Sequence, residues 1–308
     1  PALASIALKN HADALNRPWP PVWIFLGGVV LNIFLNWVMI FGKLGGPSFG
    51  LEGAGWATLI ARTAILAVMI LWLCSVKDLR DWVPHRWLRP PVWADIRRLL
   101  SIGIPASIQV LFEVSAFSAA GLLMGLIGST AMAAHQIGIT VAATAFMLPL
   151  GLSQALTVRI GEANGAGKHD QLRPIAISGW LLVVGYATCG AIILILFGRT
   201  IASWFIKTPE VIDLTAALLT IVGIFQIVDG LQVNSSAMLR GLHDARIPAV
   251  IGFISYWIIG LPAGALLAFQ GNLGARGIWW GLAIGLTTAC ITLGPRLWRR
   301  TARATSPS

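Results

Sequence analysis

The chain has 308 residues, of which 56% are apolar and only 11% charged, and its mean hydropathy is +0.78. Soluble globular proteins carry about 25% charged residues, so this composition excludes both a soluble globular domain and a disordered chain. The net charge of +10 comes from basic residues clustered between long uncharged stretches, which argues against a nucleic-acid-binding face. The composition is typical of an integral membrane protein whose partner is the lipid bilayer.

Stretches with at most one charged residue predict eight transmembrane helices, because a helix needs roughly 20 apolar residues to cross a bilayer. In chain order these stretches are 18–42, 53–76, 99–158 (long enough for two helices), 174–198, 214–239, 247–275 and 277–295. We expect the break inside 99–158 at 125–130, where two glycines interrupt the pattern. The fold class is therefore an all-α polytopic membrane protein.

The basic residues are distributed unevenly over the connections between these spans. With eight spans, seventeen of the 22 Lys and Arg residues fall in alternate connections and at the two ends of the chain. The positive-inside rule then predicts that both termini are cytoplasmic. Orientation in a membrane thus explains the net charge without any nucleic acid.

A short motif occurs twice at a constant offset of 224 residues: segments 50–56 and 274–280 share Gly, Gly and Trp at matching positions. Each copy follows an apolar stretch and opens the next predicted span. A repeat of this kind predicts a two-lobed transporter built from parallel repeats. Its second half would begin near Asp95, so we expect roughly 130 residues with four spans before Pro1.

Two carboxylates fall near the middle of predicted spans, where ionisable residues are costly and by default mark function. Glu113 has Gln109 one turn earlier, and Asp229 lies between Gln226 and Gln232. We expect both carboxylates to face the bundle interior or a wet cavity, where they can exchange protons or hold a cation. A purely structural role in a buried hydrogen-bond network is the alternative.

Other polar residues within the spans are weaker candidates. Asn32 and Asn36 lie one turn apart, and such amides also hold transmembrane helices together. We interpret His135 as a packing residue, whereas Gln136 is the better candidate for a side chain that faces a cavity. Arg62 is the only basic residue inside a predicted span.

The sequence carries no signature of an enzyme. We find no acidic pair for a catalytic metal, no phosphate-binding loop and no Ser/His/Asp set, and the three cysteines lack metal-ligand spacing. We therefore expect a non-enzymatic protein without a cofactor.

Several segments together resemble MATE (multidrug and toxic compound extrusion) transporters of the NorM-like branch. The matching segments are 113–117, 128–136 and 146–151 (seventh and eighth helices), 157–167 (the following loop), 229–233, 239–241 and 255–257 (tenth and eleventh helices), and 31–37 and 50–58 (fifth and sixth helices). The resemblance covers essentially the whole chain. It implies the last two helices of the first six-helix lobe and all of the second, without the first four helices.

This resemblance implies the following domain boundaries. They are 1–17, the cytoplasmic end of a preceding helix; 18–76, the last two helices of the N-terminal lobe; 77–95, a cytoplasmic linker; 96–298, the six-helix C-terminal lobe; and 299–308, a cytoplasmic tail.

The resemblance also implies a function: antiport of amphipathic organic cations against H⁺ or Na⁺ in a bacterial inner membrane, by a protein that works as a monomer. By similarity, Glu113 and Asp229 hold the coupling ion or the drug, with no other metal, and Gln136 lines the drug path. Phe225 stands where relatives often place a Tyr that faces the ion, so a hydroxyl contact is lost there.

In the N-terminal lobe, Asn32 and Asn36 would by the same similarity help to form a polar site. Two rival functions stay open. A lipid-linked saccharide flippase of the same superfamily would need several cationic residues along its cavity, and only Arg62 is available. A non-transporting membrane scaffold would not need Glu113 and Asp229 at the midplane.

Overall fold

The computed structural model describes residues 1–43, 48–76 and 92–304, and it divides into two compact units, Pro1–Pro91 and Val92–Ser308. Within the described residues, eight helices are long and apolar enough to cross a membrane. This finding confirms the eight spans predicted from the charge-poor stretches. Most of the predicted linker, residues 77–91, lies outside the described residues, as does the end of the predicted tail, 305–308.

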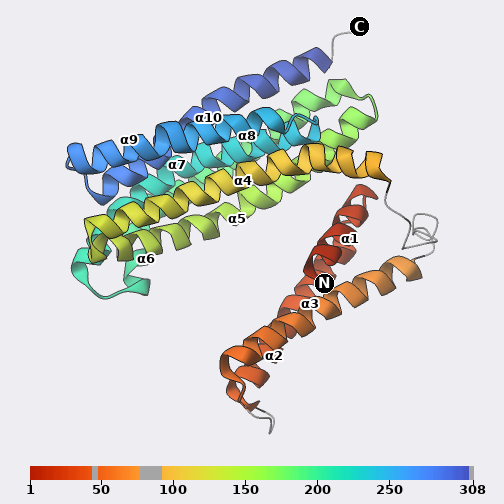
Figure 1. Ribbon diagram of the computed structural model, residues 1–308, viewed down its shortest axis with the longest axis horizontal. Coiled ribbons are helices and arrows are strands. Elements are labelled where there is room, and N and C mark those ends of the chain that lie inside the picture. The colour runs from red at the N-terminus through yellow and green to blue at the C-terminus, as the bar shows by residue number, and fades with distance from the viewer. Residues whose placement is uncertain (44–47, 77–91, 305–308) are drawn as a thin grey trace. The chain divides into compact units, whose positions relative to one another are not determined.

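The described residues of the first unit form three helices: α1 (Ala2–Ala14), α2 (Trp19–Phe41) and α3 (Gly50–Ser75) (Figure 1). Helix α3 packs against both α1 and α2. Its buried side chains recur every four residues and so form one face of the helix: Gly53, Ala57, Ala61, Ile65, Met69 and Leu73. Gly28 of α2 lies against the Ile65 side chain, so the two helices approach closely there.

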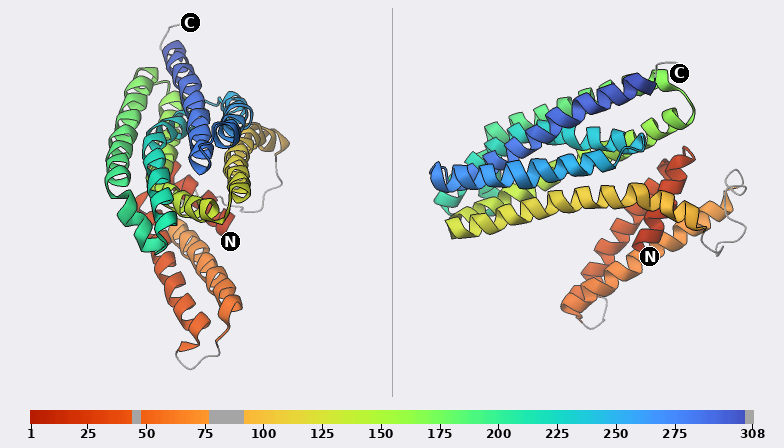
Figure 2. Two further views of the ribbon diagram at one scale, coloured as in Figure 1. Left: turned by 90° about the vertical axis from the view of Figure 1, so that its left-hand side faces the viewer. Right: turned by 45° about the horizontal axis from the view of Figure 1, so that its top comes forward.

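Where the structure describes it, residues 92–304, the second unit has six spans that run along one another (Figure 2). They are α4 (Trp93–Ile127), α5 (Ser129–Gly165), α6 (Leu172–Phe205, preceded by the short turn η3, His169–Gln171), α7 (Pro209–Gly241), a composite span of α8 (Arg246–Phe253) and α9 (Leu261–Ala265), and α10 (Ala275–Ala304). The break between α4 and α5 falls at Gly128, whose φ of 145° is open only to glycine. The predicted break at 125–130 is therefore confirmed.

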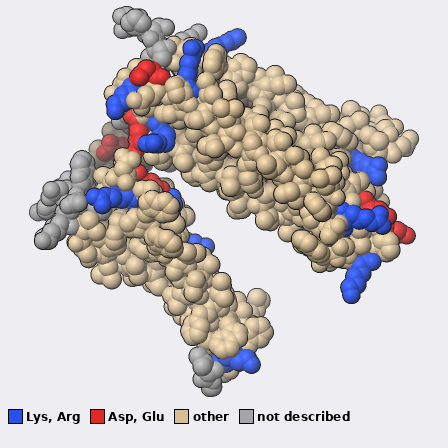
Figure 3. Space-filling model, turned by 180° about the vertical axis from the view of Figure 1, so that it is seen from behind, with Lys and Arg blue, Asp and Glu red and all other residues tan. Residues whose placement is uncertain are grey.

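Helix α7 lies at the centre of this unit, in contact with α5, α6 and α10. Of the residues in the most apolar segment of each span, 50% are buried in α7 and 56% in α10. The other spans of the unit have 17–28% of these residues buried. On the face drawn in Figure 3, the charged side chains of this unit gather at its two ends and leave the flank between them uncharged. The flank therefore suits contact with lipid acyl chains.

The composite span is not a regular α-helix, because two π-helical stretches interrupt it: η4 (Ile254–Gly260) and η5 (Leu266–Gln270). Pro262 follows the first stretch, and proline in a helix interior removes a backbone hydrogen bond. Helix α10 packs closely on this span, and a Cβ added at Gly281 would collide with the backbone of Gly264. Glycine at both positions thus allows the two backbones to touch.

The repeated Gly-x-x-Gly motif has the same local structure in both copies. Gly50 and Gly274 each have a φ of 52° immediately before or at the start of a helix, a conformation that favours glycine. The second glycine of each motif faces backbone of the preceding helical segment: Gly53 faces Met39, and Gly277 faces Leu267 and Ala268. The sequence repeat therefore corresponds to a repeated local structure at the start of a helix.

This packing makes a stability prediction. Gly281→Ala should lower the free energy of unfolding by about 1–3 kcal/mol, because the added methyl forces α9 and α10 apart. Gly125→Ala is the matched control: its Cβ would meet open space, and alanine favours a helix. Thermal unfolding in detergent should show a lower midpoint for Gly281→Ala alone; equal midpoints in the two variants would refute the close contact.

Candidate functional site

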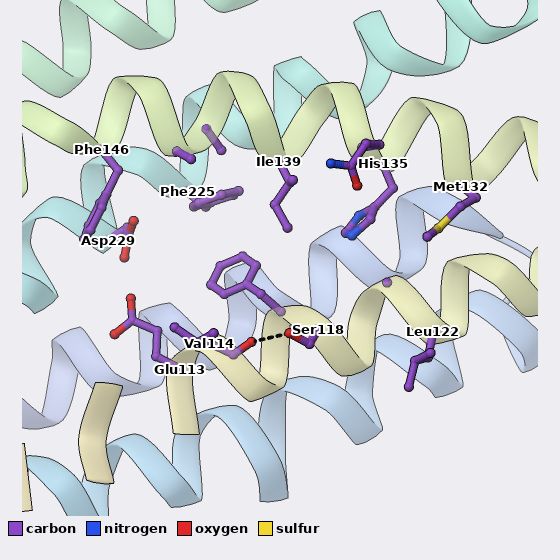
Figure 4. A pocket seen from close by; sticks show the side chains of 15 residues that line it. Glu113, Val114, Ser118, Leu122, Met132, His135, Ile139, Phe146, Phe225 and Asp229 are labelled. Carbon is purple, nitrogen blue, oxygen red and sulfur yellow. Dashed lines mark hydrogen bonds between the residues drawn. The ribbon is translucent and has the colours of Figure 1, made fainter. Parts of the chain in front are cut away.

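The second unit contains a partly open cavity of about 520 Å³ between α4, α5 and α7 (Figure 4). Its wall is mostly apolar. The lining residues are Glu113, Val114, Phe117, Ser118, Gly121 and Leu122 of α4, Met132, His135, Gln136, Ile139, Ala142, Ala143 and Phe146 of α5, and Phe225 and Asp229 of α7. The cavity is of the size that proteins use to hold a small organic molecule.

Glu113 and Asp229 point toward each other at one end of this cavity, from α4 and α7 respectively (Figure 4). Asp229 is only 6% exposed, and its Oδ1 has no hydrogen-bond partner among the described residues. The two carboxylates interact electrostatically. Two like charges that share a poorly solvated site repel each other, and an unpaired buried charge is costly. The pair is therefore suited to take up a proton or another cation.

A third group that interacts electrostatically with Glu113 is Arg240, near the end of α7. Arg240 is partly buried and does not line the cavity. Among the described residues that do line it, none is Lys or Arg. The charged groups that face the cavity are therefore acidic.

Aromatic rings form the wall on the α5 and α7 side. Phe225 stacks on Trp279 of α10, with 5.6 Å between the ring centroids and 26° between the planes. The His135 ring lies 5.5 Å from the same indole, and Phe146 faces the cavity near Asp229 (Figure 4). Trp279 is fully buried, so it fixes both rings from behind. Aromatic faces beside carboxylates can bind a cation that has an apolar body.

A model of the protein family described as MatE matches residues 105–266, more than half of the chain. The chain belongs to the MatE family. It is 37% identical over 301 residues to the probable multidrug resistance protein NorM of Agrobacterium fabrum, an alignment that covers 96% of this chain and 65% of that relative. It is 36% identical over 313 residues to the protein of the same name from Mesorhizobium japonicum, covering 100% of this chain and 67% of the relative.

The fold is also that of solved MATE structures. A crystal structure of a mutant of the Vibrio cholerae MATE transporter VcmN matches this chain with a TM-score of 0.85 at 22% identity, covering 98% of this chain and 68% of that one. The chain thus spans about two thirds of the length of these relatives. The resemblance inferred from short motifs is confirmed, and so is the all-α membrane fold.

In this MatE chain, four of the six site residues expected from the sequence line one cavity: Glu113, Gln136, Phe225 and Asp229. The other two belong to the first unit. There Asn36 donates a hydrogen bond from Nδ2 to Oδ1 of Asn32, 3.0 Å away. The two asparagines therefore partner each other along one face of α2.

The glutamines near the carboxylates do not line the cavity. Gln109 donates a hydrogen bond from Nε2 to Oγ of Ser236, 2.9 Å away, and so joins α4 to α7. Gln226 faces α6, where its Oε1 would lie 3.3 Å from a Cβ added at Gly190. Polar side chains that are close to Glu113 and Asp229 in the sequence thus face different neighbouring helices.

Tyr256 does not line the cavity but interacts with its two carboxylates, and the sequence did not point to it. Tyr256 belongs to the π-helical stretch η4, and its side chain is fully buried. Its hydroxyl has no hydrogen-bond partner among the described residues, yet it interacts electrostatically with both Glu113 and Asp229. The sequence signal that could have indicated Tyr256 is its position a few residues before Pro262, in an irregular part of the span. Irregular π-helical stretches are frequent at functional sites.

Proposed function

We propose that this chain forms the cavity-bearing part of a secondary antiporter that exports amphipathic organic cations in exchange for H⁺ or Na⁺. The observation that carries the proposal is the pair of facing carboxylates, Glu113 and Asp229, at one end of an otherwise apolar and aromatic cavity. The names of the relatives support multidrug efflux. Transport changes no covalent bond of the drug, so the proposal needs no catalytic residue and no cofactor.

The mechanism follows from competition for the same negative charge. In one state a proton or Na⁺ binds to the carboxylate pair and lowers its negative charge, which weakens the attraction of the cavity for a cationic drug. In the other state the ion has left, and the drug binds with its charge near Glu113 and Asp229 and its apolar body against rings such as Phe225. The ion gradient drives export because ion and drug bind the two states differently. Gln136 supplies a polar contact along the drug path.

Location and assembly complete the proposal. We place the protein in a bacterial inner membrane with both termini cytoplasmic, as the excess of basic residues in alternate connections indicates. It works as a monomer, because the cavity is built from the helices of one unit of one chain. The predicted boundaries of the two lobes, 18–76 and 96–298, are retained as part of this proposal.

The rival functions fit the cavity less well. A lipid-linked saccharide flippase must bind the negative charge of a diphosphate linkage, whereas the described lining of this cavity contains two carboxylates and no Lys or Arg. Arg62 lies exposed on α3 of the first unit. A membrane scaffold would gain nothing from placing two carboxylates around an apolar cavity, because their desolvation is costly.

The charge of the cavity predicts substrate selectivity. Bacteria without their own efflux pumps that express this gene should become resistant to cationic dyes such as ethidium, but not to anionic drugs of similar size. Dye efflux from reconstituted vesicles, driven by an imposed H⁺ or Na⁺ gradient, identifies the coupling ion. Protection against anionic drugs alone would contradict the proposal.

A further inference from the structure

A second set of hollows lies away from the carboxylate cavity, where the turn between α7 and α8 meets the C-terminal part of α10. Two adjoining hollows of about 580 and 510 Å³ share Ile247, Arg296 and Arg300 in their walls. We call them together the α8–α10 groove. Its residues take no part in the transport mechanism proposed above.

One buried carboxylate organises the basic side chains of this groove. Arg296 donates to Oδ2 of Asp244 from Nε at 2.9 Å and from Nη2 at 2.7 Å, and Arg300 donates to the same oxygen from Nε at 2.9 Å. The Asp244 side chain is only 5% exposed, whereas those of Arg296 and Arg300 are 31% and 49% exposed. A single acid therefore holds two partly exposed guanidinium groups side by side.

Two more arginines leave the groove strongly positive. Arg246 and Arg299 line it and are exposed, and neither forms an ion pair with an acid in the part of the chain that the structure describes. Four cations thus face one carboxylate, Asp244. Paired guanidinium groups are the protein groups best suited to bind a phosphate.

The surroundings of the groove are those of a membrane interface. Ile247 and Ile251 of α8 and Ile291 of α10 line its apolar side, and Ile291 is 66% exposed. Nearby on α10, the Trp298 ring is covered by the guanidinium of Arg173, 4.6 Å from its centroid. Tryptophan is enriched where a membrane meets water. An anionic group in the groove is therefore surrounded by cations and lies beside exposed apolar side chains.

We propose that the α8–α10 groove binds an anionic phospholipid, with the headgroup phosphate on Arg246, Arg296, Arg299 and Arg300 and the acyl chains along α8 and α10. Basic pockets between transmembrane helices are known to select such headgroups. The exposed isoleucines favour a lipid over free phosphate, because a soluble anion would leave them in contact with water.

Lipid binding to the purified protein tests this proposal. In detergent, native mass spectrometry with added phosphatidylglycerol should show a tightly bound lipid that phosphatidylcholine does not replace. The double variant Arg246→Gln, Arg299→Gln should bind phosphatidylglycerol about 25-fold more weakly, since each basic residue near an anionic lipid contributes about fivefold. Both arginines are exposed and outside ion pairs, so the fold should not depend on them.

The matched control removes the same charge at the other end of the unit. Lys207 lies just after α6 and Arg276 at the start of α10, and both are exposed. Lys207→Gln with Arg276→Gln should leave phosphatidylglycerol binding unchanged. An equal loss in the two double variants, equal binding of phosphatidylcholine, or displacement of the lipid by millimolar inorganic phosphate would each overturn the proposal.

Discussion

Replacing Glu113 by Gln, or Asp229 by Asn, should reduce gradient-driven drug efflux to background. Each amide keeps the shape and much of the hydrogen bonding of the acid but removes the charge on which ion and drug compete. Expression and membrane insertion should stay near wild type, because an amide is cheaper to bury than a carboxylate. Rates are measured as dye efflux from vesicles with an imposed ion gradient.

The double variant adds a sharper result. If the two carboxylates serve one bound cation, the double variant Glu113→Gln, Asp229→Asn should weaken equilibrium drug binding no more than either single change does, because residues that act as a unit are not additive. Asp213→Asn is the matched control: it lies on α7 like Asp229, but its side chain is 56% exposed and pairs with Arg199 at the surface, 2.7 Å away. Wild-type pumping by both neutral variants would show that the carboxylates are structural.

The spans could be predicted because the membrane leaves a strong one-dimensional signal. A charge-poor stretch long enough to cross a bilayer is rare in a soluble protein, and each stretch found in the sequence is helical here, with 99–158 divided into two helices. The break at Gly128 could also be predicted from the sequence, because a φ of 145° is available only to glycine. These features depend on local sequence alone.

The site was predictable only in part, because helix periodicity shows which residues share a face but not which neighbour that face meets. Asp229 and Gln226 lie one turn apart on α7, yet Asp229 faces the cavity and Gln226 faces α6. Similarly, Gln109 precedes Glu113 by one turn but bonds to Ser236. The position of α7 at the centre of the bundle, in contact with three spans, causes this division.

Tyr256 could not be placed from periodicity at all. The π-helical stretch η4 changes the register of the composite span, so an α-helical pattern assigns its residues to wrong faces. The result is a fully buried tyrosine whose hydroxyl has no hydrogen-bond partner among the described residues. Leaving a buried polar group unpaired costs about 1–3 kcal/mol. The proposed transport cycle offers such a partner, either the coupling ion or a protonated carboxyl of Glu113 or Asp229.

Tyr256→Phe should therefore weaken ion coupling without weakening the fold. The ion concentration that gives half-maximal efflux should rise about tenfold, which corresponds to about 1.4 kcal/mol, the size of one hydrogen bond. The thermal unfolding midpoint without the ion should stay the same or increase, because the substitution removes an unpaired buried hydroxyl. Efflux at a series of ion concentrations and thermal unfolding in detergent give the two measurements.

The chain offers a matched control in its only other tyrosine. The Tyr186 hydroxyl donates a hydrogen bond to the Ala145 carbonyl, 3.0 Å away, and does not line the cavity. Tyr186→Phe should therefore lose about 0.5–1.5 kcal/mol of stability and keep the wild-type ion dependence. Since the two substitutions remove the same atom, opposite effects on stability and coupling would separate a functional hydroxyl from a structural one. An unchanged ion dependence in Tyr256→Phe would mean that this tyrosine only fills space beside the carboxylates.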